Sequence, residues 1–311
     1  MGSAATSDFT IDKLGSGVYA AIARPGGVAL SNSTIVDLGD ATVLFDSMLT
    51  PTAGAALARA ARRLTGRAPD FVVDSHYHHD HVWGNGAAHP VHVVASRRTR
   101  DLLARRGHEQ FISARREFRQ ELPLLDSPES TVPPRERAFY RGWFRGVLAM
   151  PSSFRVRLPD VTFEEEMVLH GSRRELRLIT QGGGHSPSDV YGYLEDEHLA
   201  LLGDLVVTEM HPSLGDGFPR EWVRILGEVR RLRPERIVPG HGPVGKYRDI
   251  TTVEEYIRDL TRLVDRTKDR RQPVEIPERY RDWSGSTFFE SNVSRIRWDT
   301  KRAQRTPSSS R

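Results

Sequence analysis

The sequence concentrates metal-binding side chains in one short stretch, DSHYHHDH at residues 74–81, directly after an apolar run. Imidazole and carboxylate are the ligands that borderline cations such as zinc accept without thiolates. At the end of an extended strand His76 and His78 point to the same side, and a following turn lets Asp80 and His81 address a second point nearby. A polar loop whose histidines are satisfied by water is the alternative, but this density of ligands favours a metal site.

Three further candidate ligands stand alone in the second half of the chain, each after a predicted strand: His185, Asp204 and His241. Glycine stands next to each of them, in the stretches GGGH, LLGD and PGHG. Because glycine lacks Cβ, the backbone at these places is able to turn sharply and to approach a compact site. Each stretch is weak evidence alone, since Gly-Asp is usually a turn. In this order after the histidine cluster, the set indicates one shared site.

The elements that must position these residues alternate between strands and helices, which predicts sheets covered by helices. The runs 33–38 and 41–46 flank the turn Gly39-Asp40 and are typical of a hairpin. Other apolar runs predict strands at 17–22, 28–30, 71–73, 91–94, 161–163, 176–179, 190–194, 199–202 and 237–238. Helical spacing and caps predict helices at 51–66, from Ser96 to about Gly107, at 220–232, and from a capping box of Thr252 and Glu255 onward.

The stretch 108–158 departs from this alternation. It is rich in arginine, carries several aromatic residues and is punctuated by prolines, so we interpret it as a helical insertion. Two roles remain open for it: a lid over the site, or a packing element or dimer contact.

Composition excludes several classes of function. The 311 residues include no cysteine, which excludes disulfides, thiolate zinc sites and cysteine nucleophiles. The first ten residues lack the pattern of a signal peptide and no apolar run is long enough to span a bilayer, so we expect a cytoplasmic protein without a membrane partner. The net charge is +4, and the arginines after residue 258 interleave with acidic residues. This favours a solvated helix with ion pairs over a nucleic-acid surface.

The ligand set resembles that of the metallo-β-lactamase-fold hydrolases: His76-x-His78-x-Asp80-His81, then His185, Asp204 and His241. The resemblance covers about residues 15–245 and is specific for the superfamily rather than for one member. It implies an α/β fold, a four-layer αββα sandwich with the metals at one edge of the sheets. The expected divisions are a domain at 15–250 containing the insertion, a helical extension at 251–304 and a disordered tail at 305–311.

The resemblance also implies two divalent cations, zinc first, with iron or manganese as alternatives. His76, His78 and His185 would hold one of them, Asp80, His81 and His241 the other, and Asp204 would bridge the two. Two such metals clamp a water molecule and lower its pKa toward about 7, so that it attacks a carbonyl. Asp80 and His81 are the predicted catalytic residues, with Asp80 or a metal-bound water passing the proton to the leaving group.

Four residues are weaker candidates. Asp46 and Asp74 end apolar runs, and either orients a metal-binding imidazole or caps its local turn. Ser186 resembles the small hydroxyl residue that follows the family's histidine, and we expect it to order that loop. His211 either lines the substrate pocket or faces water.

The predicted function is hydrolysis of a small carbonyl substrate: a lactone, an ester, a thioester or a β-lactam-like amide. Three alternatives remain: a sulfur-dioxygenase-type iron oxidoreductase, a glyoxalase II-like thioesterase, and a metal-binding module without turnover. A homodimer is compatible with the sequence.

Overall fold

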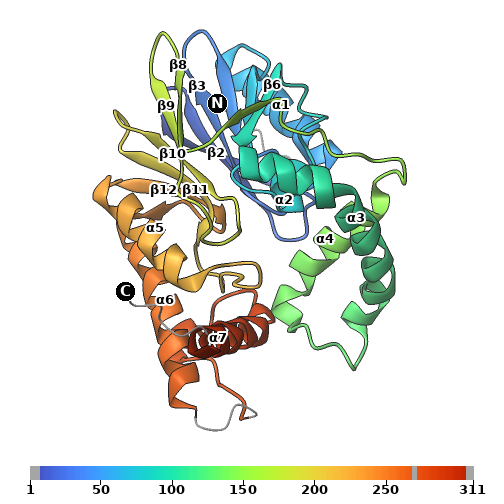
Figure 1. Cartoon of the computed structure of the whole chain (residues 1–311). Coiled ribbons are helices and arrows are strands. Elements are labelled where there is room, and N and C mark those ends of the chain that lie inside the picture. The colour runs from blue at the N-terminus through green and yellow to red at the C-terminus, as the bar shows by residue number, and fades with distance from the viewer. Residues whose placement is uncertain (1–7, 268–271, 306–311) are drawn as a thin grey trace.

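Two β-sheets pack face to face in the computed structural model, which describes residues 8–267 and 272–305, and helices cover both outer faces (Figure 1). The first sheet contains seven strands in chain order: β1 (Phe9–Gly15), β2 (Val18–Ala23), β3 (Ser33–Asp37), β4 (Thr42–Phe45), β5 (Phe71–Val73), β6 (His92–Ser96) and β7 (Val161–Phe163). The second sheet has the order β13-β12-β11-β10-β9-β8: β8 (Glu166–His170), β9 (Glu175–Thr180), β10 (Val190–Leu194), β11 (Leu199–Val207), β12 (Arg236–His241) and β13 (Gly245–Lys246).

Alternation along the strands produces the layers. In β3 and β4, Ile35 and Leu44 face outward onto α1 (Pro51–Thr65), whereas Val36 and Val43 face the second sheet. The second sheet repeats the pattern: its outward residues pack under α5 (Pro219–Arg231) and α6 (Tyr247–Arg266), and its inward residues meet the first sheet. The predicted four-layer αββα sandwich is therefore confirmed.

The stretch expected to be an insertion is helical, but its first helix is longer than the sequence predicted. The N-cap Ser96 accepts a hydrogen bond from the Thr99 amide, as predicted, and α3 then runs from Arg97 to Glu121. The expected end near Gly107 was wrong, because this glycine allows Val156 to pack closely against the helix; a Cβ there would lie 3.0 Å from it. Short 3₁₀ turns at Leu122–Asp126 and Pro134–Glu136 lead to α4 (Arg137–Ala149).

Figure 1 shows α3 and α4 projecting from the sandwich on one side, with α6 and α7 (Phe288–Arg305) on the other. The insertion has its own core, in which Phe111, Phe118 and Phe144 pack together with Tyr77 and Trp83 of the ligand segment. The insertion is thereby anchored directly on the segment that carries the histidine cluster.

Other local predictions need correction. Residues 28–30 form no strand but a loop, in which Leu30 has a positive φ of 65°. The capping box at Thr252 was wrong: α6 begins at Tyr247, its N-cap amide at Lys246 donates to Asp249, and Thr252 bonds back to Arg248 within the helix. The sequence interpretation also missed the strands β1, β8 and β13.

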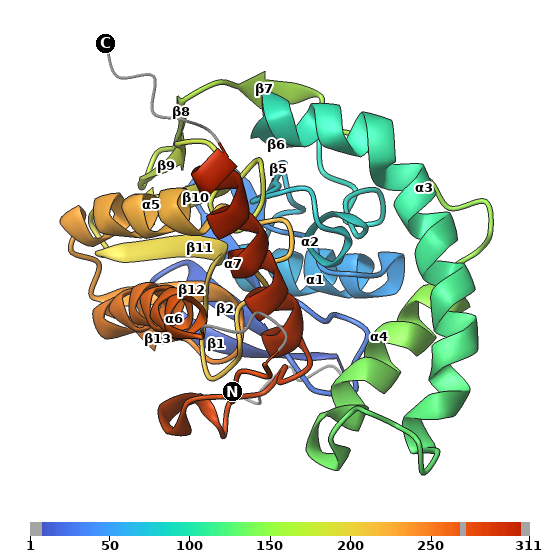
Figure 2. The ribbon, with the colours of Figure 1, turned by 60° about the horizontal axis from the view of Figure 1, so that its bottom comes forward.

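The C-terminal part is helical in α6, in a 3₁₀ turn at Glu278–Tyr280, and in α7, which crosses in front of the sandwich in Figure 2. Residues of α6 form ion pairs within the helix, including Arg258 with Glu254 and Arg262 with Asp259. The expected disordered tail began at residue 305, but Arg305 ends α7, and residues 306–311 lie outside the described residues. Among the described helices, none combines the length and the apolar character needed to cross a membrane.

Candidate metal centre

The seven predicted ligands come from four places in the fold. His76 and His78 lie between β5 and the short helix α2 (His79–Val82), which carries Asp80 and His81. His185 lies in the loop between β9 and β10, Asp204 is in β11, and His241 ends β12. Because β11 and β12 run parallel, and β4, β5 and β6 do as well, their carboxyl ends bring these residues to one edge of the sandwich.

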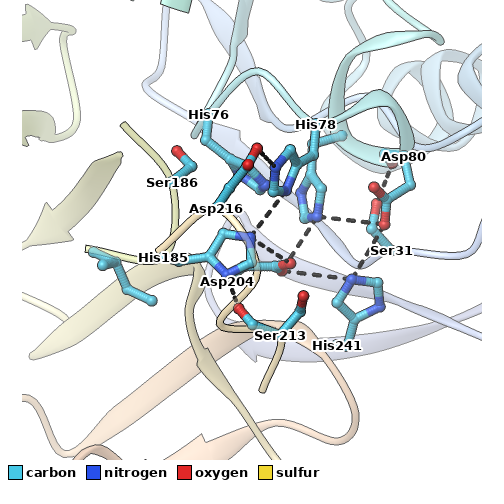
Figure 3. A network of polar contacts seen from close by, with 12 residues as sticks. Ser31, His76, His78, Asp80, His185, Ser186, Asp204, Ser213, Asp216 and His241 are labelled. Atoms are coloured by element: carbon cyan, nitrogen blue, oxygen red, sulfur yellow. Dashed lines mark hydrogen bonds and ion pairs between the residues drawn. The ribbon is translucent and has the colours of Figure 1, made fainter. Parts of the chain in front are cut away.

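The structure gathers these side chains into two adjoining groups (Figure 3). One group is His76, His78, His185 and Asp204, the other is Asp80, His81 and His241, and within each group the ligand atoms lie within 4.8 Å of one another. Asp204 reaches both groups. Its Oδ2 lies 3.4 Å from His185 Nε2, and its Oδ1 lies 3.2 Å from His81 Nε2 and 3.5 Å from His241 Nε2. This is the position that a bridging carboxylate requires.

Outer hydrogen bonds fix which nitrogen of each ring faces inward. His185 Nδ1 lies 3.1 Å from the Ser213 carbonyl, and His241 Nδ1 lies 3.1 Å from the Leu30 carbonyl. Because a carbonyl oxygen only accepts, both Nδ1 atoms carry the proton. Each Nε2 then presents a lone pair to the centre of the site.

The other three rings are held in the same way. His81 Nδ1 lies 2.7 Å from the Asp46 carboxylate, and His76 Nδ1 lies 2.9 Å from Ser75 Oγ, whose own proton is donated to Asp46. His78 is reversed: its Nε2 lies 3.4 Å from Asp216, and its Nδ1 faces His185 Nε2 at 2.9 Å. In its neutral form, each of the five imidazoles therefore directs a lone pair toward one small volume.

Three of the inward atoms have no hydrogen bond within the protein. His76 Nε2, His81 Nε2 and Asp204 Oδ1 are buried without a hydrogen bond. Leaving such groups unpaired costs about 1–3 kcal/mol each. Converging imidazole and carboxylate donors without thiolate are the set that zinc and similar divalent cations bind, so the residues present fit two such ions.

The site places three buried carboxylates, those of Asp46, Asp80 and Asp204, among its histidines, and their charges shift the pKa values. Burial would raise the pKa of Asp80, but the neighbouring His81 and His241 lower it well below its usual range. Burial would lower the pKa of His241, but Asp204 and Asp80 raise it to about 10. Conversely, burial lowers the pKa of His185 to about 4. Without cations, protons on some histidines therefore balance the carboxylates.

Comparison with known proteins identifies the family to which this geometry belongs. Residues 26–241, more than half of the chain, match the family model described as the metallo-beta-lactamase superfamily.

The chain belongs to the metallo-β-lactamase superfamily.

Solved structures of this superfamily share the fold at low sequence identity. A metallo-beta-lactamase from Pontibacter korlensis is 19% identical, with a TM-score of 0.59, over 81% of this chain and 99% of that one. One from Erythrobacter litoralis is 15% identical, with a TM-score of 0.58, over 83% and 100%. FIM-1 from Pseudomonas aeruginosa is 16% identical, with a TM-score of 0.57, over 81% and 96%. At these identities the likeness concerns the fold. No curated protein sequence matches the chain.

The four weaker candidates from the sequence have different surroundings in the structure. Asp46 contacts His81, whereas Asp74 contacts no metal-binding histidine and instead accepts from Asn85, with burial raising its pKa well above the usual range. Ser186 donates to Asp189 at 2.6 Å and thus orders the loop that carries His185. His211 lines the cavity beside the metal centre rather than facing water, and its Nδ1 lies 3.0 Å from the Tyr256 hydroxyl.

Two contributors were missed in the sequence. Asp216, in a Gly-Asp-Gly stretch typical of a turn, contacts both His78 and the Tyr77 hydroxyl. Its pKa lies well below the usual range, chiefly because of its hydrogen bond with His78. His79 is half-buried; its Nε2 accepts from Trp143 Nε1 at 3.0 Å, and it lines the same cavity. Asp216 and Trp143 are far in sequence from the histidines they contact, so no local sequence pattern indicates these contacts.

Proposed function

We propose that this protein is a hydrolase that uses two divalent cations, zinc first, to cleave a small carbonyl substrate: a lactone, an ester, a thioester or a cyclic amide. The observation that carries this proposal is the convergence of five oriented imidazole lone pairs with Asp80 and Asp204. FIM-1, a similar fold, is described in a mono-zinc form, which supports zinc as the first candidate.

The residues have distinct roles in this proposal. His76, His78 and His185 would hold one cation, Asp80, His81 and His241 would hold the other, and Asp204, whose two oxygens face both groups, would bind both. Cations bound there supply Lewis acidity, which activates water and polarises the carbonyl of the substrate. Asp80 and Asp204 border the cavity, so their carboxylates are the chain's own groups placed to pass a proton from the attacking water to the leaving group.

The test combines metal analysis with a substrate panel. Purified protein should contain about two equivalents of zinc per chain and should hydrolyse at least one of a set of lactones, esters, thioesters and β-lactams. His76→Ala should lose nearly all activity while its circular dichroism remains that of the parent. Iron as the bound metal, together with oxygen uptake on a persulfide, would instead identify a sulfur-dioxygenase-type oxidoreductase.

A further inference from the structure

A cavity of about 200 Å³ opens beside the metal ligands, and apart from them most of its wall is apolar. Phe139 and Trp143 of α4 form one side, and Phe288 at the start of α7 contributes from the other part of the chain. Leu30, Val207 and Met210 complete this apolar wall. Such a surface favours an apolar ligand, since each methylene group that leaves water contributes about 0.8 kcal/mol.

The described residues that line this cavity include neither lysine nor arginine. Among its remaining polar groups, His79 accepts from Trp143 and the Ser213 carbonyl accepts from His185. His211 pairs with Tyr256 through Nδ1, its Nε2 has no protein partner, and burial lowers its pKa to about 4, so its ring is neutral. A carboxylate on the arm of a substrate would lose its hydration here and find no lysine or arginine to pair with. Burying an unpaired charge is strongly unfavourable.

A second hollow of about 340 Å³ continues from the first past Leu30, Phe139, Met210 and His241 to the loop at 24–27. Its one lining arginine, Arg24, is exposed, and Glu209 lines the same hollow with the opposite charge. The continuation therefore offers length for an apolar arm without a buried lysine or arginine in its wall.

Resting on the hydrolase function proposed above, we propose that the substrate is a neutral ester or lactone whose apolar acyl or aryl arm lies between α4 and the start of α7, and that a carboxylate on this arm is rejected. Carboxylate-bearing substrates of the class of β-lactams and glutathione thioesters are accordingly poor substrates.

The first experiment compares two ester series on zinc-reconstituted protein. In p-nitrophenyl alkanoates from acetate to octanoate, kcat/KM should rise with chain length until the cavity is full. Mono-p-nitrophenyl esters of dicarboxylic acids of matching length should be at least about tenfold poorer, the ratio that corresponds to about 1.4 kcal/mol. Equal rates in the two series, or a preference for the carboxylate, would overturn the proposal.

Variants locate the effect in the cavity. Trp143→Ala and Phe288→Ala should flatten the dependence on chain length. Trp298→Ala is the matched control, because this tryptophan also lies on α7 but is 48% exposed and outside the cavity lining. Phe139→Lys, which introduces a cation into the wall, should improve the dicarboxylate esters relative to the neutral ones. Unchanged selectivity in all three cavity variants contradicts the assignment.

A binding measurement separates this inference from the hydrolase proposal. Calorimetry on metal-free protein with a series of alkanamides should show affinity rising about fourfold per methylene, and Trp143→Ala should reduce the gradient. Graded binding without hydrolysis of any ester would sink the hydrolase proposal while supporting the cavity assignment. Hydrolysis without any gradient, in rate or in binding, would sink the cavity assignment alone.

Discussion

At the scale of single residues, the proposed metal centre depends on the proton that each imidazole carries on its outer nitrogen. A histidine binds a cation through an unprotonated nitrogen, so the partner of the other nitrogen selects the binding form. Backbone carbonyls do this for His185 and His241, and the Asp46 carboxylate does it for His81. Ordinary hydrogen bonds outside the site thereby prepare the ligands inside it.

Asp46→Asn tests this dependence. The Asn amide would donate toward His81 Nδ1 and so move the ring proton to Nε2, the inward atom. The backbone tolerates the change, because the φ of 66° at this position suits asparagine. We expect metal affinity to fall about 10–100-fold, measured by competition with a chromogenic chelator. Asp160→Asn is the control, since Asp160 contacts His92 at the surface. Equal affinity in parent and Asp46→Asn would refute the orienting role.

The raised pKa of His241 predicts a pH dependence for the metal-free protein. Its folded-state pKa is about 10, against about 6.5 in an unfolded chain. Between these values the folded state binds the additional proton, so the free energy of unfolding should fall with rising pH by as much as about 1.4 kcal/mol per pH unit. The stabilisation is complete below pH 6.5 and lost above pH 10.

Urea unfolding of chelator-treated protein at a series of pH values measures this decline. Zinc-loaded protein should show a weaker decline, because a cation replaces the proton beside Asp80 and Asp204. Parallel declines with and without metal would contradict the explanation.

At the scale of elements, close backbone approach between β11 and β12 places Asp204 at the centre. A Cβ on Gly240 would lie 1.9 Å from Asp204 Oδ1 and 2.7 Å from the carbonyl carbon of Gly203. The absence of a side chain at Gly240 therefore leaves room for Asp204 and for the backbone of β11. This is a physical reason for the glycine that accompanies the ligand.

Gly240→Ala should displace Asp204, lower stability by about 1–3 kcal/mol and abolish binding of the second equivalent of zinc. Gly227→Ala on α5 is the matched control, because a Cβ there meets nothing within 4 Å. That control should stabilise the protein by about 1 kcal/mol. Thermal unfolding and zinc titration of both variants test the pair, and two equivalents of tightly bound zinc in Gly240→Ala would be the contrary result.

At the scale of the whole molecule, the insertion and the C-terminal segment meet at the cavity. Ser286 donates to the buried Glu136 carboxylate through its hydroxyl at 2.8 Å and its amide at 3.3 Å, and Tyr140 contacts Thr287. These contacts join parts of the chain 150 residues apart. They hold α4, with Phe139 and Trp143, in place as one wall of the cavity.

Ser286→Ala removes one of these bonds and should cost about 1–3 kcal/mol at the junction. Because the bond links α4 to the remainder of the chain, we expect faster tryptic cleavage after Arg137, Arg141 and Arg145, measured by mass spectrometry. Ser291→Ala is the control: that hydroxyl bonds within its own helix region, to Phe288. Identical cleavage rates in the two variants would show that the junction does not hold α4.

Patterns of residues close in sequence were sufficient to predict much of the fold and the candidate metal ligands of this protein. The alternation of strands with helices predicted sheets covered by helices, and the resemblance of the ligand set implied the four layers. Residue chemistry and neighbouring glycines singled out the seven side chains that the structure brings together. Local capping predicted the start of α3 at Ser96, but local patterns failed at Gly107 and Thr252, where contacts between elements and an earlier cap decide the helix bounds.

Only the tertiary structure decided which groups orient the ligands and what surrounds them. Asp46 and Asp74 look alike in sequence, since each ends an apolar strand, yet only Asp46 meets an imidazole. Asp216 and Trp143 reach His78 and His79 across many residues of chain. Which side chains are able to bind a metal depends on their chemistry, and the residue types are given directly by the sequence. Orientation depends on how sheets and helices pack, and no short-range pattern encodes that packing.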